Sequence, residues 1–256
     1  MYGFALKGKW LVATIAVALI AFTFVNLGLW QLRRLDWRRE NNIRILTRRE
    51  LPPTSLQEHI GEPASEIEYR RVTAKGVYDT QDELILFGRP NPDGLQGSHV
   101  LTPLVTPDGS TIIVDRGWVP LSMAEPPIAD SLPPEGKVNV SGILLPPESE
   151  GGTDPPAGGK IKGVDLDQIS AALGRSVMPV FLMLNLQDPP QPGEYPVPAE
   201  IPELTEGSHF SYALQWFLFT VIGLVGYGAL VRREAIDRKK RAGRPMADLE
   251  ELQAAD

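Results

Sequence analysis

Two long stretches without a charged residue, Trp10 to Trp30 and Phe210 to Val231, limit what this chain can fold into. They hold 21 and 22 residues, and an α-helix needs about 20 apolar residues to cross the core of a bilayer. Each stretch carries tryptophan at or near an end, as membrane-spanning helices do at the interface. The first is too long for the apolar core of a signal peptide, and no small-residue cleavage site follows it. The sequence therefore predicts two transmembrane helices, over residues 10–32 and 209–231.

The charges around the two stretches predict their orientation. Lys7 and Lys9 precede the first, and seven basic residues closely follow the second. Because basic residues favour the cytoplasmic side, both termini are expected there. Arginines also follow the first stretch, but a long domain crosses the membrane largely regardless of its charge. The predicted regions are a cytoplasmic N-terminus over 1–9, an extracytoplasmic domain over 33–208 and a charged cytoplasmic tail over 232–256.

The domain between the predicted helices is acidic and has few groups that bind metals. Residues 33–208 contain 16 basic and 26 acidic residues, a net charge of −10 that argues against nucleic acid as a partner. The chain has no cysteine, which excludes disulfides, thiolate metal sites and thioether haem attachment. Its three histidines are too few for a multi-histidine metal cage. His59 is predicted at the surface, and His99 is predicted to make a structural hydrogen bond at the start of a strand.

Short apolar runs separated by turn residues predict a β-rich domain. Pro107-Asp108-Gly109 is a hairpin signal, because proline presets φ and glycine allows a positive φ. One short helix is predicted over Val164 to Leu173, begun by Asp165 and ended by Gly174. The expected strands are Ile67 to Tyr78, Glu83 to Gly88, His99 to Thr106, Ser110 to Val119, Lys137 to Leu145 and Val177 to Leu186.

The fold class that follows is an integral membrane α+β protein. Two transmembrane helices flank an extracytoplasmic domain, which is a small antiparallel sheet or barrel with one short helix. Residues 33–50 can continue the first helix until Leu51-Pro52-Pro53 stops it. Pro146 to Gly159 and Asp188 to Pro202 are rich in proline and are predicted as surface loops or linkers. The second of these would tether the domain to the second helix.

No catalytic constellation is visible in this sequence. The densest motif within the domain is Asp115-Arg116-Gly117-Trp118-Val119-Pro120, which ends an apolar strand. In a structural interpretation, Arg116 pairs with a local carboxylate and Trp118 packs on the core. In a functional interpretation, Arg116 contacts an anion and Trp118 anchors the domain at the membrane surface. The residues alone favour the structural interpretation and leave the other open.

Aromatic and charged side chains line one face at the outer end of each predicted helix. On the second helix, residues at i, i+3 and i+7 share a face: His209, Tyr212 and Trp216. On the first helix the corresponding residues are Asn26, Trp30, Arg33 or Arg34, and Trp37. Both ends are expected at the same depth, so these groups would converge. Haem needs an imidazole, apolar flat surfaces and arginines for its propionates, but a hydrogen-bonded seam between helices would also use these residues.

Three motifs in order and spacing resemble the surfeit locus protein family. They are Gly28-x-Trp30-Gln31-Leu32-x-Arg34-x-x-Trp37-Arg38, Arg116-Gly117-Trp118-Val119-Pro120 and His209-x-x-Tyr212-Ala213-x-x-Trp216-Phe217. The two-helix layout and the region Gly88 to Leu104 are also similar to the family, and the resemblance covers most of residues 20–230. Departures are Arg38 in place of lysine, Asp115 in place of asparagine, Ser98 in place of an aromatic residue, and Gly207-Ser208 in place of asparagines.

The resemblance implies a non-enzymatic assembly factor for haem–copper cytochrome c oxidase in the bacterial plasma membrane. Bacterial members of the family are thought to receive haem a and to help place it in the catalytic subunit. The implied ligand of the haem iron is His209. The resemblance also maps a tryptophan and an arginine of the family onto Trp30 and Arg34. Our hypothesis for the haem contacts is Trp30, Tyr212 and Trp216 at the ring and Arg33, Arg34 and Arg116 at the propionates. The implied partners are the catalytic subunit of the oxidase, a haem a synthase and the lipid bilayer.

Two other functions fit the same sequence. A scaffold could grip an oxidase subunit without haem, either during assembly only or as a retained accessory subunit of the oxidase or a respiratory supercomplex. A two-helix extracytoplasmic sensor is the third hypothesis, although a tail over 232–256 is too short for an output domain.

Overall fold

The structure is a computed structural model that describes residues 2–123, 128, 131–148, 158–201 and 203–242. The chain divides into two compact units, which we call the helical unit and the β unit. The helical unit contains residues 1–42 and 204–256, and the β unit contains residues 43–203. Most of the predicted loop at 146–159 and the end of the predicted tail lie outside the described residues.

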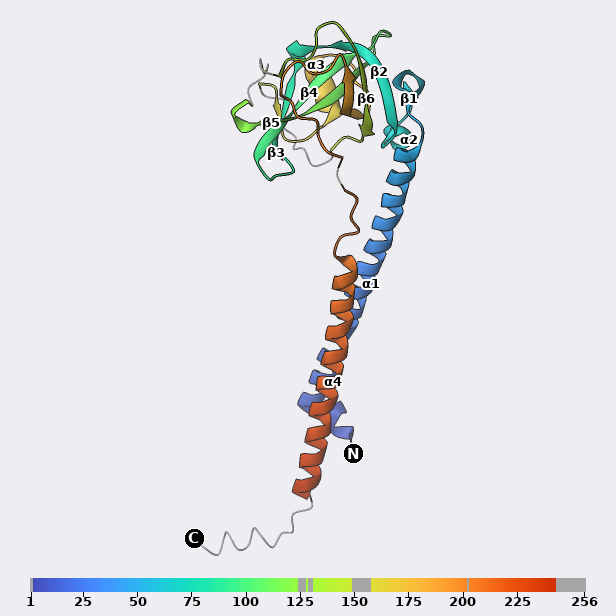
Figure 1. The fold of residues 1–256 in the computed structure, drawn as a ribbon. Coiled ribbons are helices and arrows are strands. Elements are labelled where there is room, and N and C mark those ends of the chain that lie inside the picture. The colour runs from blue at the N-terminus through green and yellow to red at the C-terminus, as the bar shows by residue number, and fades with distance from the viewer. Residues whose placement is uncertain (1, 124–127, 129–130, 149–157, 202, 243–256) are drawn as a thin grey trace, which may run out of the picture. The chain divides into compact units, whose positions relative to one another are not determined.

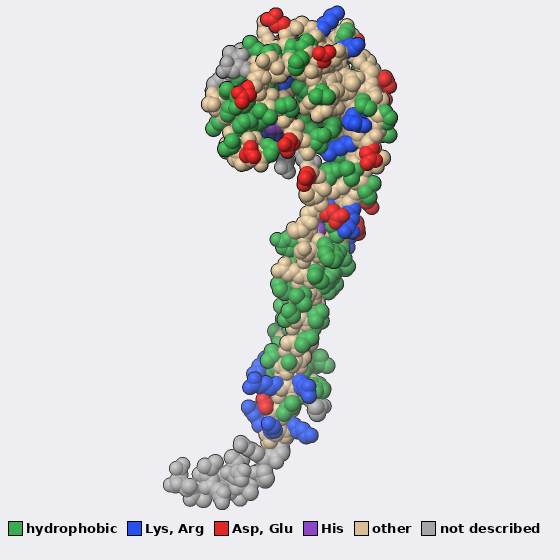
Figure 2. Space-filling view, viewed as in Figure 1, with side chains coloured by type: hydrophobic (Ala, Val, Ile, Leu, Met, Phe, Trp, Pro, Cys, Tyr) green, Lys and Arg blue, Asp and Glu red, His purple; other side chains and the backbone are tan. Residues whose placement is uncertain are grey.

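Two long helices that run side by side make up the helical unit (Figure 1). Helix α1 spans Gly8–Glu50, and α4 spans His209–Ala242. Both are long and apolar enough to cross a membrane, and Figure 2 shows hydrophobic side chains along the pair, with Lys and Arg gathered at the end where α4 finishes. The predicted continuation of the first helix through residues 33–50 is confirmed, and α1 ends just before Pro52-Pro53.

Close packing holds α1 against α4. Gly28 lies directly against the ring of Phe217, because a Cβ added at Gly28 would fall 2.6 Å from that ring. Farther into the apolar part, Phe24 packs on Trp216 with ring centroids 5.1 Å apart. At another level, Thr14 of α1 pairs with Tyr227 of α4. The segment that leads into α4 is also tied to α1, through Arg39 with Glu206 and Asn42 with Thr205. This row of contacts is called the helix seam below.

The β unit is a curved sheet whose central strands close into a ring (Figure 1). The strand order is β1-β2-β6-β8-β5-β4-β3-β7, and β2 also pairs with β4, so β2, β6, β8, β5 and β4 form a barrel. Closure removes free edges from these strands. The strands are β1 Thr54–Ser55, β2 Arg71–Tyr78, β3 Leu84–Pro90, β4 Gln96–Val105, β5 Thr111–Pro120, β6 Lys137–Leu145, β7 Lys160–Ile161 and β8 Phe181–Asp188.

Strand β5 lies at the centre of the unit and is buried on both faces. Ile112 and Val114 point into the cluster that fills the barrel. Ile113, which points to the opposite face of the strand, joins a second cluster with Ile169 of helix α3, Leu166–Leu173. The run of apolar residues in this strand is therefore explained by cover on both sides.

The predicted ends of α3 are confirmed. The Asp165 carboxylate accepts hydrogen bonds from the backbone N–H groups of Asp167 and Gln168, and Gly174 adopts a left-handed φ of 62° after the last turn. The predicted strands are present with shifted ends. Two starts are wrong by four residues. Ile67 closes a short helix, α2 (Ala64–Ile67), and β2 begins only at Arg71, while β8 begins at Phe181 and not at Val177.

Candidate functional site

His209 begins α4 and faces α1 across the helix seam. Its Nδ1 lies 2.8 Å from Oε1 of Gln31. A carbonyl oxygen can only accept, so Nδ1 carries the hydrogen and Nε2 of the neutral ring keeps a lone pair. Within the described part of the chain, no group hydrogen-bonds to Nε2. The ring can therefore bind a metal through Nε2.

Gly207 keeps the Nε2 side of this imidazole uncrowded. Its φ is 72°, a conformation that favours glycine, and a Cβ added there would lie 3.6 Å from Nε2. Gly207 stands where the resemblance leads us to expect asparagine. It has no side chain, so it leaves space next to Nε2 of His209.

An aromatic cluster lies on the apolar side of His209. Trp216 is two turns into α4 from His209, and it packs on Phe24 and Phe219. Tyr212 is 50% exposed and Trp30 is 53% exposed, so both present open ring faces at the surface of the helical unit. Of the three predicted ring contacts, only Trp216 has a ring contact across the helix seam among the described residues.

Helical geometry separates the arginines that follow the first apolar segment. With 100° per residue, Arg34 and Arg38 lie within about 60° of Gln31 around α1, whereas Arg33 lies about 200° away. Arg34 also stacks on Trp37, with its Cζ 4.2 Å from the ring centroid. Arg34 and Arg38 are thus on the face of α1 that carries the contact to His209, and Arg33 is on the opposite face.

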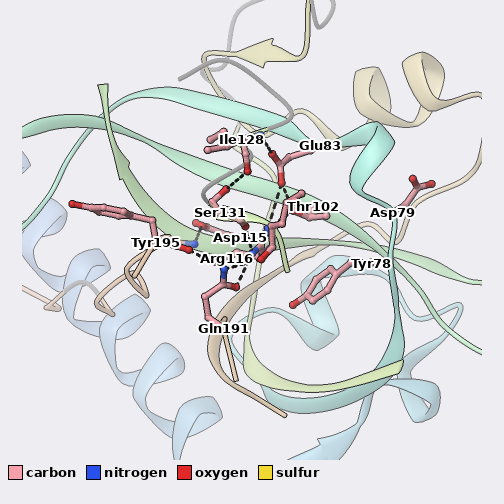
Figure 3. Close-up of polar contacts among 12 residues, drawn as sticks. Tyr78, Asp79, Glu83, Thr102, Asp115, Arg116, Ile128, Ser131, Gln191 and Tyr195 are labelled. Atoms are coloured by element: carbon pink, nitrogen blue, oxygen red, sulfur yellow. Dashed lines mark hydrogen bonds and ion pairs between the residues drawn. The ribbon is translucent and has the colours of Figure 1, made fainter. Parts of the chain in front are cut away.

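Arg116 belongs to the β unit and is buried, with 1% of the residue exposed. Its Nη1 lies 3.3 Å from Oε2 of Glu83. Its Nη2 donates to the backbone oxygen of Ser131 and, over 2.8 Å, to Oε1 of Gln191 (Figure 3). The structural interpretation of the Arg116 motif is therefore confirmed. The expected contact of Arg116 with a propionate is wrong, since protein groups enclose the guanidinium.

Glu83 completes this buried network. Its other carboxylate oxygen accepts a hydrogen bond from the backbone N–H of Ile128, at 3.1 Å. Burial raises the pKa of Glu83 above the usual range, against the opposing effects of the Ile128 hydrogen bond and of Arg116. Burial likewise lowers the pKa of Arg116, against the opposing effects of Tyr78 and Glu83. Each partner therefore offsets part of the cost of burying the other inside the domain.

The rest of the motif fastens the segment that follows β8. Trp118 and Val197 exchange two backbone hydrogen bonds, of 2.7 and 2.9 Å. The indole N–H of Trp118 donates to the backbone oxygen of Arg89, at 2.9 Å. Gly117 has φ of 121°, and a Cβ there would fall 2.0 Å from the Val197 oxygen, so only glycine fits. The segment predicted as a loose linker is thus docked on the barrel as far as Val197.

The other two histidines have structural roles. His99 Nδ1 lies 2.8 Å from a carboxylate oxygen of Asp115, which confirms the predicted structural hydrogen bond. His59 is only 8% exposed and contacts Thr54 and Glu62, so its predicted place at the surface is wrong. Among the described residues, no cluster of three or more His, Asp or Glu side chains could hold a metal ion.

The fold and the helix seam define a class of protein, in which two helices suited to anchoring in a membrane carry one barrel domain. Residues 18–221 match the model of the SURF1 family, and the chain belongs to that family. The match includes Gln31, the Arg116 motif and His209. Members of this family are known generally as oxidase assembly factors, and the family is not a known class of enzyme.

Individual relatives agree with this assignment. A SURF1-like protein of Mycobacterium tuberculosis is 28% identical over 96% of this chain and 92% of its own length. Surfeit locus protein 1 of Homo sapiens is 26% identical over 78% of this chain and 71% of its own length. Surfeit locus protein 1 of Takifugu rubripes is 34% identical over 49% of this chain and 58% of its own length.

Proposed function

We propose that this protein is a membrane-anchored assembly factor for haem–copper cytochrome c oxidase that holds haem a transiently and passes it to the catalytic subunit. Haem a is the cargo in this proposal and is not a resident cofactor. The observation that carries it is the imidazole of His209, whose Nδ1–H is engaged by Gln31 and whose Nε2 is free to bind iron.

The order of side chains along α1 supports the same ligand. Phe24 and its aromatic partners lie toward the apolar part of the helix, Gln31 contacts His209, and Arg34 and Arg38 follow toward the polar end. A haem has the same polarity, with an apolar ring and propionates at one edge. Arginine binds carboxylates through charge-assisted, often bidentate hydrogen bonds. In this proposal Arg34 and Arg38 take the propionates, whereas Arg33, on the opposite face of α1, does not.

A single histidine also suits a carrier. One Fe–N bond, without a covalent attachment, holds the cargo and still allows its release to an acceptor with more ligands. The proposed partners are the catalytic subunit as acceptor and a haem a synthase as donor, with the lipid bilayer around α1 and α4. The proposed location is the bacterial plasma membrane, with the barrel domain on the extracytoplasmic side and both termini in the cytoplasm.

The test is the optical spectrum of the full chain, purified in detergent from cells that make haem a. Wild type should carry a Soret band that His209→Ala loses. Phe210→Ala is the matched control, because Phe210 is the next residue along and is 61% exposed. Equal Soret absorbance in wild type and His209→Ala would rule out His209 as the ligand, and no haem in wild type would refute the carrier.

A scaffold that grips an oxidase subunit without haem is the second candidate. It is favoured by the exposure of Trp30 and Trp37, at 53% and 50%, because exposed tryptophans next to arginines are typical of contact surfaces between proteins. A retained accessory subunit would co-purify with mature oxidase at a fixed ratio, and an assembly factor would be found only with immature catalytic subunit.

A further inference from the structure

Gln31 lies in the motif that follows the first apolar segment, and its role is visible only in the structure. Its side-chain oxygen lies 2.8 Å from Nδ1 of His209, although 178 residues separate the two along the chain. This contact is the hydrogen bond between the helices at the level where α4 begins, and it fixes which ring nitrogen carries the hydrogen.

Packing on both sides holds the Gln31 amide in place. One turn before it, Gly28 touches the ring of Phe217. One turn after it, Leu35 is buried, with 3% of the residue exposed. A side chain between two closely packed turns of α1 has few alternative positions, so its oxygen stays directed at Nδ1.

The geometry assigns Gln31 as the positioning residue of the site: it holds His209 in the Nδ1–H tautomer and so presents Nε2 to the cargo. This inference rests on the proposed function for the identity of the cargo, but not for the tautomer. Imidazoles that bind metals usually donate their second N–H to a carboxylate, a carbonyl or water, which fixes the ring orientation and raises the basicity of the ligand. An uncharged amide gives orientation with a smaller increase in basicity than a carboxylate, which suits a site that must release what it binds.

The first test needs no haem. The chain has three histidines, so ¹⁵N labelling of histidine gives only six ring nitrogens, and the signals missing in His209→Ala assign that residue. At a pH above the ordinary histidine range, wild type should show Nδ1 protonated and Nε2 bare. Gln31→Leu should populate both tautomers, and Gln31→Glu, which keeps an acceptor oxygen, should restore the wild-type pattern.

Asn26→Leu is the matched control. Asn26 is another amide on α1, and it donates to the backbone oxygen of Phe22 on its own helix. The Asn26→Leu variant should leave the His209 signals unchanged. A wild-type His209 that carries its hydrogen on Nε2, or a Gln31→Leu protein with the wild-type pattern, would overturn the assignment.

The second test measures retention of haem by the same variants. Loss of a hydrogen-bond partner behind a metal-binding imidazole typically weakens metal affinity by about 10–100-fold, so Gln31→Leu should release haem a that much more readily than wild type or Asn26→Leu. Equal retention would overturn the positioning role. Absence of haem from wild type would refute the proposed function instead, and the tautomer measurement would then decide the role of Gln31 alone.

Discussion

Each residue of Arg116-Gly117-Trp118 has a separate task. Arg116 neutralises Glu83 inside the domain, Gly117 lets the backbone of Val197 approach, and Trp118 pairs with that backbone. The motif therefore stabilises the domain and fastens the segment that leads out of it. A dense motif of charged and aromatic residues suggested a ligand site as readily, because sequence does not reveal whether a guanidinium is enclosed.

Replacing Arg116 tests this role. Arg116→Ala should lower the free energy of unfolding of the domain by about 3–5 kcal/mol, because Glu83 is left buried without its partner. Arg175→Ala is the control, since Arg175 bridges Asp79 and Asp82 at a partly exposed position and should cost about 1 kcal/mol or less. Chemical denaturation of both variants provides the comparison, and equal losses would contradict the account.

Glu83 makes the stability of the domain depend on pH. Burial raises its pKa, so the folded state takes up this proton more readily than the unfolded chain. Its contribution to stability is therefore full below the ordinary glutamate pKa and is lost as pH rises through the raised value. The melting temperature of Glu83→Gln relative to wild type should therefore rise as the pH is raised above about 4, the ordinary glutamate pKa. A difference that stays constant or falls over this range would contradict the raised pKa.

At the scale of elements, the spacing of apolar residues predicts helices and strands that are long enough to show a repeat. The caps Asp165 and Gly174 identified both ends of α3, and the alternation along β2 identified a strand with one face on the core. Strands β1 and β7 have two residues each, too few to carry a period. The docking of Val197 on Trp118 depends on backbone hydrogen bonds, so proline and glycine content alone suggested a loose linker.

The site was also predicted only in part, because contacts between distant segments do not follow from a local pattern. Helical spacing placed His209 and Trp216 on one face and predicted that this face meets the first helix. Which residue of α1 meets His209 depends on how the helices align, and the spacing of one helix cannot supply it. The motif Trp30-Gln31-Leu32 was the available signal for Gln31. The sequence does not decide between Arg33 and Arg34, and the choice follows from the Gln31 contact and a rotation of 100° per residue.

The packing of the seam is testable at its closest point. Gly28→Ala should weaken the association of α1 with α4 by about 1–3 kcal/mol, because the new methyl group would overlap the Phe217 ring. Gly223→Ala is the control on α4, where a Cβ meets nothing within 4 Å. Thermal unfolding in detergent, followed by the fluorescence of Trp216 with the other tryptophans replaced, compares the two. Equal stability would show that the helices do not meet at Gly28.

For the whole molecule, the helical unit and the β unit have different tasks in this account. The helices supply the proposed membrane anchor and the proposed cargo site, and the barrel is stabilised by its own core and by the Glu83–Arg116 network. Because the two units have different tasks, we expect variants in one unit to cause a different defect from variants in the other. Variants of Arg116 should lower the amount of protein, whereas variants of His209 should leave the amount unchanged and remove the function.

The most direct test of the central claim is the haem a content of the oxidase catalytic subunit, isolated from cells whose only copy of this protein carries His209→Ala. The account predicts a subunit deficient in haem a, although the variant protein is present at the wild-type level, and a full complement with Phe210→Ala. A full complement of haem a with His209→Ala would contradict delivery through this histidine.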